Sequence, residues 1–217
     1  MAFDVKKEYK DLYQPATTPS IIEVPRMRFV AVEGSGDPNE EGGDYQTALQ
    51  LLYGVSFTIK MSRKSKDPAD HIEGYYDYVV PPLEGLWHMD APSGDGTIDY
   101  SRKMDFQWTS MIRLPEFVTD EAFDACVTRF AAKHPEADVS RVFLLDWAEG
   151  LVGQVMHKGP YDDEPATIAT LDQHIAESGH RLDFDPANRR LHHEIYLGDP
   201  RKSKPENLRT VIRHPIV

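Results

Sequence analysis

Apolar and polar residues alternate in several segments of the chain, and this alternation predicts β-strands. In the first such segment, residues 21–33, the apolar positions centre on Met27, Phe29 and Ala31. The same pattern predicts strands over residues 75–80, 84–89, 105–114, 141–147, 151–157, 191–197 and 208–215. We expect Gly150 to form a turn between the strands over residues 141–147 and 151–157.

A helical period of apolar residues marks three other segments. The first helix is expected over residues 44–60 with Asp44 as its N-cap, the second begins after the capping residue Thr119, and the third runs from Pro165 to Gly179. Their apolar stripes consist of Ala48, Leu51, Leu52, Val55 and Ile59; of Phe123, Cys126, Val127 and Phe130; and of Ile168, Leu171 and Ile175.

The order of these elements is the same in both halves of the chain. Residues 21–115 and 116–217 each give a strand, a glycine turn, a helix and further strands, so we predict an α+β fold of two pseudo-symmetric βαββ-type repeats in one domain, residues 21–217. The helices would cover one face of an antiparallel sheet and leave a ligand cleft on the other. When the two halves are aligned, the segment that begins at Glu84 is equivalent to the segment that begins at Glu194. Residues 1–20 are expected to form a polar N-terminal lead-in segment that lies on the surface of the domain.

Composition excludes several classes of protein. The 217 residues carry a net charge of −12, and an acidic surface repels phosphate, so we expect no nucleic-acid partner. No apolar run reaches the length of a membrane span, and the N-terminus lacks the apolar core of a signal peptide, so we expect a soluble cytoplasmic protein without membrane contact. The single cysteine, Cys126, excludes an intrachain disulfide and is expected to be a buried small hydrophobe. The pattern leaves the oligomeric state open.

The strand over residues 191–197 carries the most informative side chains. Alternation sends His192, Glu194 and Tyr196 to one face of the sheet and His193 to the other, the helix-covered core. A carboxylate among aromatic rings on the open face can pair with a ligand cation or act as a general base. In the alternative interpretation that face meets water and Glu194 is a solvated charge. Adjacent histidines point opposite ways and no HExxH motif is present, so we predict no metal site.

Aromatic residues supply the second candidate feature. Trp87 and Trp108 lie on predicted strands, where they can line a cleft for flat or cationic molecules or simply belong to the core. His157 and Tyr161 lie at the end of a strand and in the turn after it, a common place for functional side chains. No glycine-rich phosphate motif or nucleophile elbow is present, so we expect no cofactor.

These segments together resemble the GyrI-like family of small-molecule-binding proteins. The resemblance covers about residues 20–217 and rests on MHKGPY at 156–161, the helix after it, HEIYLGDP at 193–200 and LRTVIRHP at 208–215. In the first half, PPLEGLW at 81–87 and FQWTSMIR at 106–113 are similar to a stand-alone subgroup. The resemblance implies a cleft between the repeats in which a buried glutamate, here Glu194, takes up bulky and often cationic aromatic compounds.

Three functional hypotheses follow from the resemblance. The first is a stand-alone protein that binds such compounds through Glu194, Tyr161, Trp87, Trp108, Tyr196 and His157. The second is a hydrolase that adds water to cyclopropane rings in DNA-alkylating natural products, with Glu194 orienting or deprotonating the water and Tyr161 donating a hydrogen bond to the substrate's carbonyl. The third is an inhibitor or partner protein of a large enzyme such as a gyrase.

Overall fold

Six antiparallel strands form the centre of the molecule in a computed structural model that describes residues 2–89 and 98–217. They close into a barrel in the order β1-β3-β2-β5-β6-β4. The strands are β1 (Ser20–Ser35), β2 (Leu83–Met89), β3 (Phe106–Arg113), β4 (Phe143–Lys158), β5 (His192–Tyr196) and β6 (Arg209–Pro215). In both halves of the chain the second and third strands pair as neighbours, β2 with β3 and β5 with β6.

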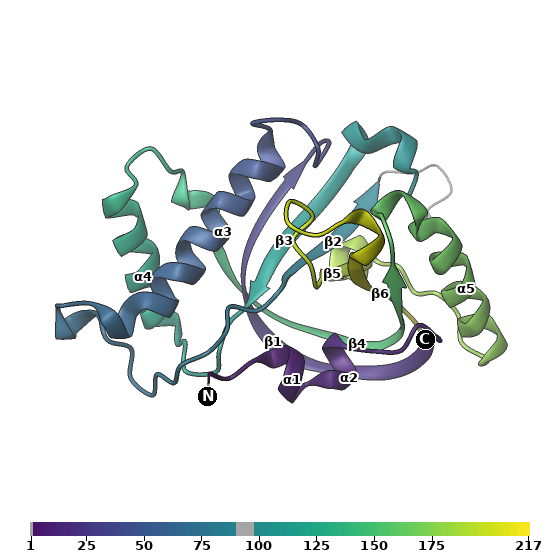
Figure 1. Cartoon of the computed structure of the whole chain (residues 1–217), viewed down its shortest axis with the longest axis horizontal. Coiled ribbons are helices and arrows are strands. Elements are labelled where there is room, and N and C mark those ends of the chain that lie inside the picture. Colours follow the sequence, from purple (N-terminus) through teal and green to yellow (C-terminus); the bar gives the residue numbers. More distant parts are fainter. Residues whose placement is uncertain (1, 90–97) are drawn as a thin grey trace.

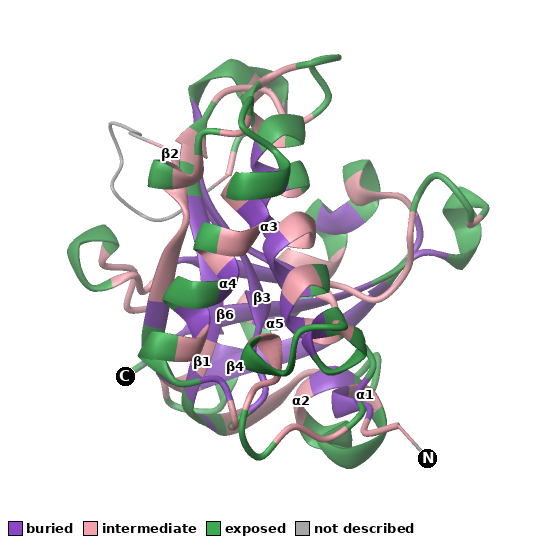
Figure 2. Cartoon of the chain, turned by 90° about the vertical axis from the view of Figure 1, so that its left-hand side faces the viewer, coloured by how far each residue is buried: buried purple, intermediate pink, exposed green. Residues whose placement is uncertain are grey.

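The three long helices lie against the outside of the barrel, as Figure 1 shows. Helices α3 (Asp44–Met61) and α4 (Asp120–Lys133) pack together on one side, and α5 (Glu164–Glu177) lies on the other. Apolar residues of α3 and α4 cover the outer faces of β1, β2 and β3, whereas Leu171 and Ile175 of α5 cover Val155 and Ile212. Figure 2 shows buried strands with helices whose outward faces are exposed.

A second apolar core fills the inside of the barrel. Residues of different strands meet there, among them Phe29 of β1, Leu86 of β2, Met111 of β3 and Trp147 of β4. The sheet is therefore buried on both faces, because closure gives the face away from the helices a core of its own.

The N-terminal segment covers one end of the barrel. Its two short helices are α1 (Val5–Glu8) and α2 (Lys10–Tyr13). Tyr13 is 1% exposed, and the carbonyl oxygens of Asp11 and Leu12 accept hydrogen bonds from Gln154 and Arg213. The predicted lead-in over residues 1–20 is thus a packed part of the fold.

Most predicted elements are present, and Thr119 accepts a hydrogen bond from the amide of Ala122 as the N-cap of α4. The predicted strand over residues 75–80 is wrong: this segment is irregular, and only Tyr78 forms a bridge, to Phe3. Asp44 is the first residue of α3 rather than its N-cap, which is Gly43. Asp44 instead pairs with Arg141.

The expected break at Gly150 is also absent. β4 is one strand of 16 residues, and Gly150 lies within it at φ 75°, paired with Val24. Its freedom at positive φ lets the strand bend around the barrel without ending.

The expected open sheet face is wrong as well, because the sheet is a closed barrel. The element order β1-α3-β2-β3 followed by β4-α5-β5-β6 is the order predicted for two repeats, and equivalence of the halves stays a prediction. Glu84 lies beside Ile195 in the strand pairing and points into the barrel, so it does not share a face with Glu194. Within the described residues, no helix has both the length and the hydrophobicity that a membrane span requires.

Candidate functional site

Glu194 lies on the outer face of β5, and the first turns of α3 and α5 flank it. It is 7% exposed, so the interpretation as a solvated charge is wrong. The faces are the reverse of the expectation: Glu194 points toward the helix layer, whereas His193 points into the barrel. The reason is that helices α3 and α5 cover the face expected to be open, whereas closure of the sheet buries the opposite face, that of His193, inside the barrel.

Two side chains from the same face of β5 hold the carboxylate. Nε2 of His192 lies 2.8 Å from Oε1 of Glu194, and the hydroxyl of Tyr196 donates to Oε2 at 2.6 Å. The indole of Trp87 donates in turn to the hydroxyl of Tyr196 at 2.8 Å. Alternation along the strand thus brings together the three residues His192, Glu194 and Tyr196, as predicted.

Hydrogen bonds continue from His192 to helix α5. Nδ1 of His192 lies 2.8 Å from Nε2 of His214 on β6, and Nδ1 of His214 lies 2.6 Å from Oδ1 of Asp172. A carboxylate only accepts, so His214 donates to Asp172, and a neutral His214 ring then accepts from His192. This order links Glu194 to a second carboxylate through two imidazole rings.

The charges at the site follow from these contacts. Burial raises the pKa of Glu194, but the hydrogen bond and charge of His192, with the Tyr196 hydroxyl, outweigh it and hold the pKa below its ordinary value. Because Glu194 is a carboxylate, which only accepts, Nε2 of His192 donates to it. Burial lowers the pKa of His214, in keeping with a neutral ring there.

A second carboxyl group, that of Glu164, lies at the same place. Glu164 is the first residue of α5, and its side chain is 0% exposed. One atom each of Glu164, His192 and Glu194 lies within 4.8 Å of the others, an approach compatible with a shared cation or a shared proton. Since Nε2 of His192 and both oxygens of Glu194 take part in hydrogen bonds, we assign these atoms to a hydrogen-bonded network.

Aromatic rings lie between the first turn of α3 and Glu194. The ring of Tyr45 lies 5.5 Å from that of Trp87 and 5.1 Å from that of Trp108, between centroids. Trp108 is 2% exposed and lies in the core between β3 and α3, so the structure gives it a packing position. Trp87 is also buried but is connected to Glu194 through Tyr196.

Tyr161 lies on the side of Glu194 that faces α5, in the turn before that helix. Its ring meets that of Tyr196 edge-on, with 5.6 Å between centroids. Burial, with the charges of Glu164 and Glu194, raises the pKa of Tyr161 to about 12, so its hydroxyl keeps its proton and can donate.

His157 supports this turn through hydrogen bonds to Pro160 and Thr167 and does not hydrogen-bond to Glu194. Its Nε2 donates to the carbonyl of Pro160 at 3.0 Å, and Nδ1 accepts from the hydroxyl of Thr167 at 2.8 Å. The structure therefore places His157 behind Tyr161, where it holds the backbone of the turn.

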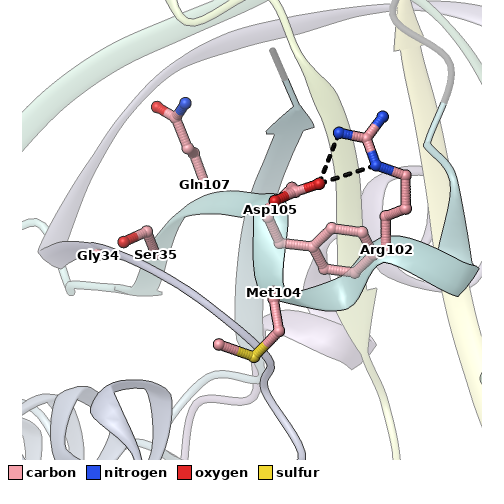
Figure 3. A pocket seen from close by; sticks show the side chains of 7 residues that line it. Gly34, Ser35, Arg102, Met104, Asp105 and Gln107 are labelled. Atoms are coloured by element: carbon pink, nitrogen blue, oxygen red, sulfur yellow. Dashed lines mark hydrogen bonds and ion pairs between the residues drawn. The ribbon is translucent and has the colours of Figure 1, made fainter. Parts of the chain in front are cut away.

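A hollow of about 590 Å³ opens beside the aromatic layer, at the ends of β1 and β3 (Figure 3). Its lining consists of Gly34, Ser35, Arg102, Met104, Asp105, Phe106 and Gln107, with Arg102 and Asp105 joined as an ion pair. None of the six predicted site residues lines it. Phe106 nevertheless contacts Trp87, with ring centroids 5.8 Å apart. Phe106 therefore lies between the hollow and the aromatic rings of Trp87 and Tyr196, which lead to Glu194.

A separate buried cluster occupies the inside of the barrel. His193 lies between Glu149 at 2.8 Å and Glu84 at 3.1 Å, and Arg213 donates to Glu149 at 2.9 Å. Burial lowers the pKa of His193, but the charges and hydrogen bonds of Glu149 and Glu84 outweigh it and raise the pKa to about 9. Two carboxylates are thus matched by two cations.

Sequence reasoning missed several residues of the outer site. These are Tyr45, Glu164, Asp172 and His214. The position of Glu164 at the start of a helix, directly after the turn of Tyr161, was the available signal. Nothing in the spacing of Asp172 and His214 relates them to residues 192–196.

Comparison with known proteins supports one family. The GyrI-like small molecule binding domain matches residues 17–217. An uncharacterized conserved protein from Listeria innocua is 41% identical with a TM-score of 0.89, and covers 99% of this chain and 100% of that chain. A hydrolase from Listeria innocua is 40% identical with a TM-score of 0.85, at the same coverage.

A more distant structure shares the fold alone. The C-terminal domain of EcmrR is 13% identical with a TM-score of 0.53, covering 92% of this chain and 97% of that domain. Among curated proteins, none matches the chain. With the family match spanning nearly all of its residues, the chain belongs to the GyrI-like small-molecule-binding family.

Proposed function

We propose that the protein is a hydrolase that adds water to a strained ring in a hydrophobic small molecule. The observation that carries this proposal is a buried carboxylate, Glu194, held on both oxygens by His192 and Tyr196. A fixed, desolvated carboxylate can orient one water and take its proton. Two hydrolases from Listeria innocua, 40% and 39% identical over nearly the whole chain, support the same class of reaction.

The proposed reaction uses a substrate with a cyclopropane ring conjugated to a carbonyl group, as the family resemblance implies. Glu194 accepts a proton from water, the water oxygen bonds to a ring carbon, and the broken carbon–carbon bond sends its electron pair to the carbonyl oxygen. Tyr161 donates a hydrogen bond to that oxygen as charge develops. The lowered pKa of Glu194 makes it a weak base but keeps it ionised at neutral pH, and release of ring strain drives the step.

A variant tests this role directly. Glu194→Gln keeps the shape of the side chain and removes its basicity, so turnover should fall by about 10²–10⁴-fold. The measurement is mass detection of the water adduct of a cyclopropane-bearing substrate, with Glu206→Gln on the exposed surface as the matched control. Turnover by Glu194→Gln at the rate of the unmodified protein would exclude Glu194 as the base.

Binding of aromatic cations is the second candidate function. Trp87, Tyr45 and Tyr161 offer ring faces and edges near a carboxylate, a combination that favours such ligands. Both oxygens of Glu194 already accept hydrogen bonds, from His192 and Tyr196, however, so a ligand cation must compete with these two donors. This competition is why we place hydrolysis first; the partner-protein hypothesis stays a prediction.

A rhodamine-type dye distinguishes the two functions. If the site takes aromatic cations, fluorescence titration should show saturable binding that weakens by at least about tenfold in Glu194→Gln, since a charge-assisted contact contributes roughly 1.5–3 kcal/mol. Equal affinities of the two proteins would contradict an ionic role. Turnover without dye binding would leave hydrolysis as the function.

A further inference from the structure

A continuous chain of hydrogen bonds runs from Glu194 to the surface of α5. From Oε1 of Glu194 it passes through the rings of His192 and His214 to Oδ1 of Asp172, over successive distances of 2.8, 2.8 and 2.6 Å. Three elements, β5, β6 and α5, supply its members (Figure 1). The chain therefore exists only because α5 packs on the outer face of these two strands.

Exposure to solvent changes along the chain. Glu194, His192 and His214 are buried, whereas the side chain of Asp172 is 33% exposed. The ring of Phe184 packs edge-on against that of His214, with 5.0 Å between centroids. The chain thus connects a buried carboxylate with a carboxylate that solvent reaches, through rings that lie in the protein.

Both groups between the two carboxylates can pass a proton on. An imidazole ring takes a proton at one nitrogen and releases one at the other. His214 donates from Nδ1 to Asp172, and burial, which lowers the pKa of His214, favours the neutral ring that accepts at Nε2. The other oxygen of Glu194 leads through Tyr196 to the indole of Trp87, which only donates and so cannot pass a proton on.

We propose that this chain is a proton relay, which carries a proton from Glu194 to Asp172 and back during the hydrolysis proposed above. The inference rests on that proposed function, because Glu194 must first take a proton from water. Glu194 is buried before any substrate binds, so its proton needs a path through the protein. His192, His214 and Asp172 act through Glu194 and are positioning residues.

The protons balance along this path. Glu194 takes a proton from water as the water oxygen bonds to a ring carbon, and the electron pair of the broken carbon–carbon bond moves to the carbonyl oxygen. One proton then moves from Nδ1 of His192 to Nε2 of His214, and another from Nδ1 of His214 to Asp172. When the carbonyl oxygen takes a proton from Glu194, both shifts reverse. One water has been added to the substrate, and the chain holds the protons with which it began.

NMR of the protein labelled with ¹⁵N in its histidine rings tests the chain without any turnover. The hydrogen bond between Nδ1 of His192 and Nε2 of His214 should give a nitrogen–nitrogen coupling across the bond. This coupling should be absent in His214→Gln and present in His134→Gln, a matched change at an exposed histidine. A wild-type spectrum without the coupling would overturn the relay.

Asp172→Asn distinguishes a relay from a merely structural contact. The amide oxygen still accepts the hydrogen bond of His214 but cannot take up a proton, so turnover in weak buffer should fall by at least about tenfold. Added imidazole should raise the turnover of this variant with concentration and leave the wild type unchanged, because a small base replaces the missing acceptor. Asp124→Asn, at an exposed position of α4, is the matched control and should turn over as the wild type does.

The outcomes separate the relay from the proposed function. Turnover of Asp172→Asn at the wild-type rate would overturn the relay alone, and so would a loss that imidazole does not restore. Absence of turnover in the wild type would instead reject the hydrolase proposal and, with it, the part of the relay in that reaction. A loss in Asp172→Asn that imidazole restores supports both.

Discussion

On the inner face of β5, His193 lies between the carboxylates of Glu84 and Glu149, while on the outer face His192 lies between Glu194 and a second histidine, His214. The strand therefore carries two buried histidine–carboxylate clusters, back to back. Burial is equally complete in both, so burial alone says nothing about which one has chemistry to perform.

Charge balance and surroundings separate the two clusters. Inside the barrel, Arg213 completes the count of cations and is itself bonded to the carbonyl of Leu12. Outside, the carboxyl groups of Glu164 and Glu194 lie together with His192, and a half-buried tyrosine, Tyr161, lies alongside. We infer that the inner cluster stabilises the fold, whereas the outer cluster is the candidate for chemistry.

The largest expected effect concerns the inner cluster. Arg213→Met removes one partner of a buried pair and leaves Glu149 without its second cation, so the free energy of unfolding should fall by about 3–5 kcal/mol. Urea denaturation measures this fall. The control is Arg209→Met at an exposed position of the same strand, which should stay within about 0.5 kcal/mol of the wild type. The distinction between the clusters fails if Glu194→Gln destabilises the fold as much as Arg213→Met.

A pH dependence of stability should come from His193. Its pKa is raised from 6.5 to about 9 in the folded protein, so its stabilisation is fully present below pH 6.5 and is lost as the pH rises through about 9. The loss amounts to roughly 3 kcal/mol. Urea denaturation at a series of pH values should show this decline in the wild type and not in His193→Gln. An equal decline in both would assign it to another group.

The smallest expected effect lies where the N-terminal segment meets the inner cluster. The hydroxyl of Tyr13 donates to Glu84 at 3.2 Å, and Tyr13→Phe should cost about 1 kcal/mol. Limited proteolysis should then cleave residues 2–19 faster, while turnover at Glu194 stays unchanged. A fall in turnover would show that the two faces of β5 are coupled.

Local patterns predicted what depends on local geometry. Alternation placed His192, Glu194 and Tyr196 on one face, and helical spacing placed the apolar stripe of α3. Closure of the barrel was not predictable in this way, because it requires β1 to pair with β3 on one edge and β4 on the other, contacts far apart in the chain. Without closure, the faces of β5 were assigned in reverse.

The residues of the outer site that the sequence did not predict were missed for the same reason, because their contacts depend on tertiary structure. Glu164 and Asp172 meet residues of β5 and β6 only after α5 packs on the barrel, so their proximity to Glu194 and His214 belongs to tertiary structure. Tyr161 was predicted as a site residue because turn residues after a strand often carry function and the motif around it resembles a known family; the structure places its ring against Tyr196, and its role stays a prediction.

The pairing of β1 with β4 has a consequence for synthesis on the ribosome. Ser20 at the start of β1 pairs with Gln154 of β4, and the carbonyl of Leu12 accepts its hydrogen bond from Arg213, which lies near the end of the chain. A nascent chain that has emerged only as far as residue 115 therefore exposes one whole edge of β1, the kind of edge that recruits other strands. Chaperone capture and aggregation of stalled or truncated products should be concentrated in that interval.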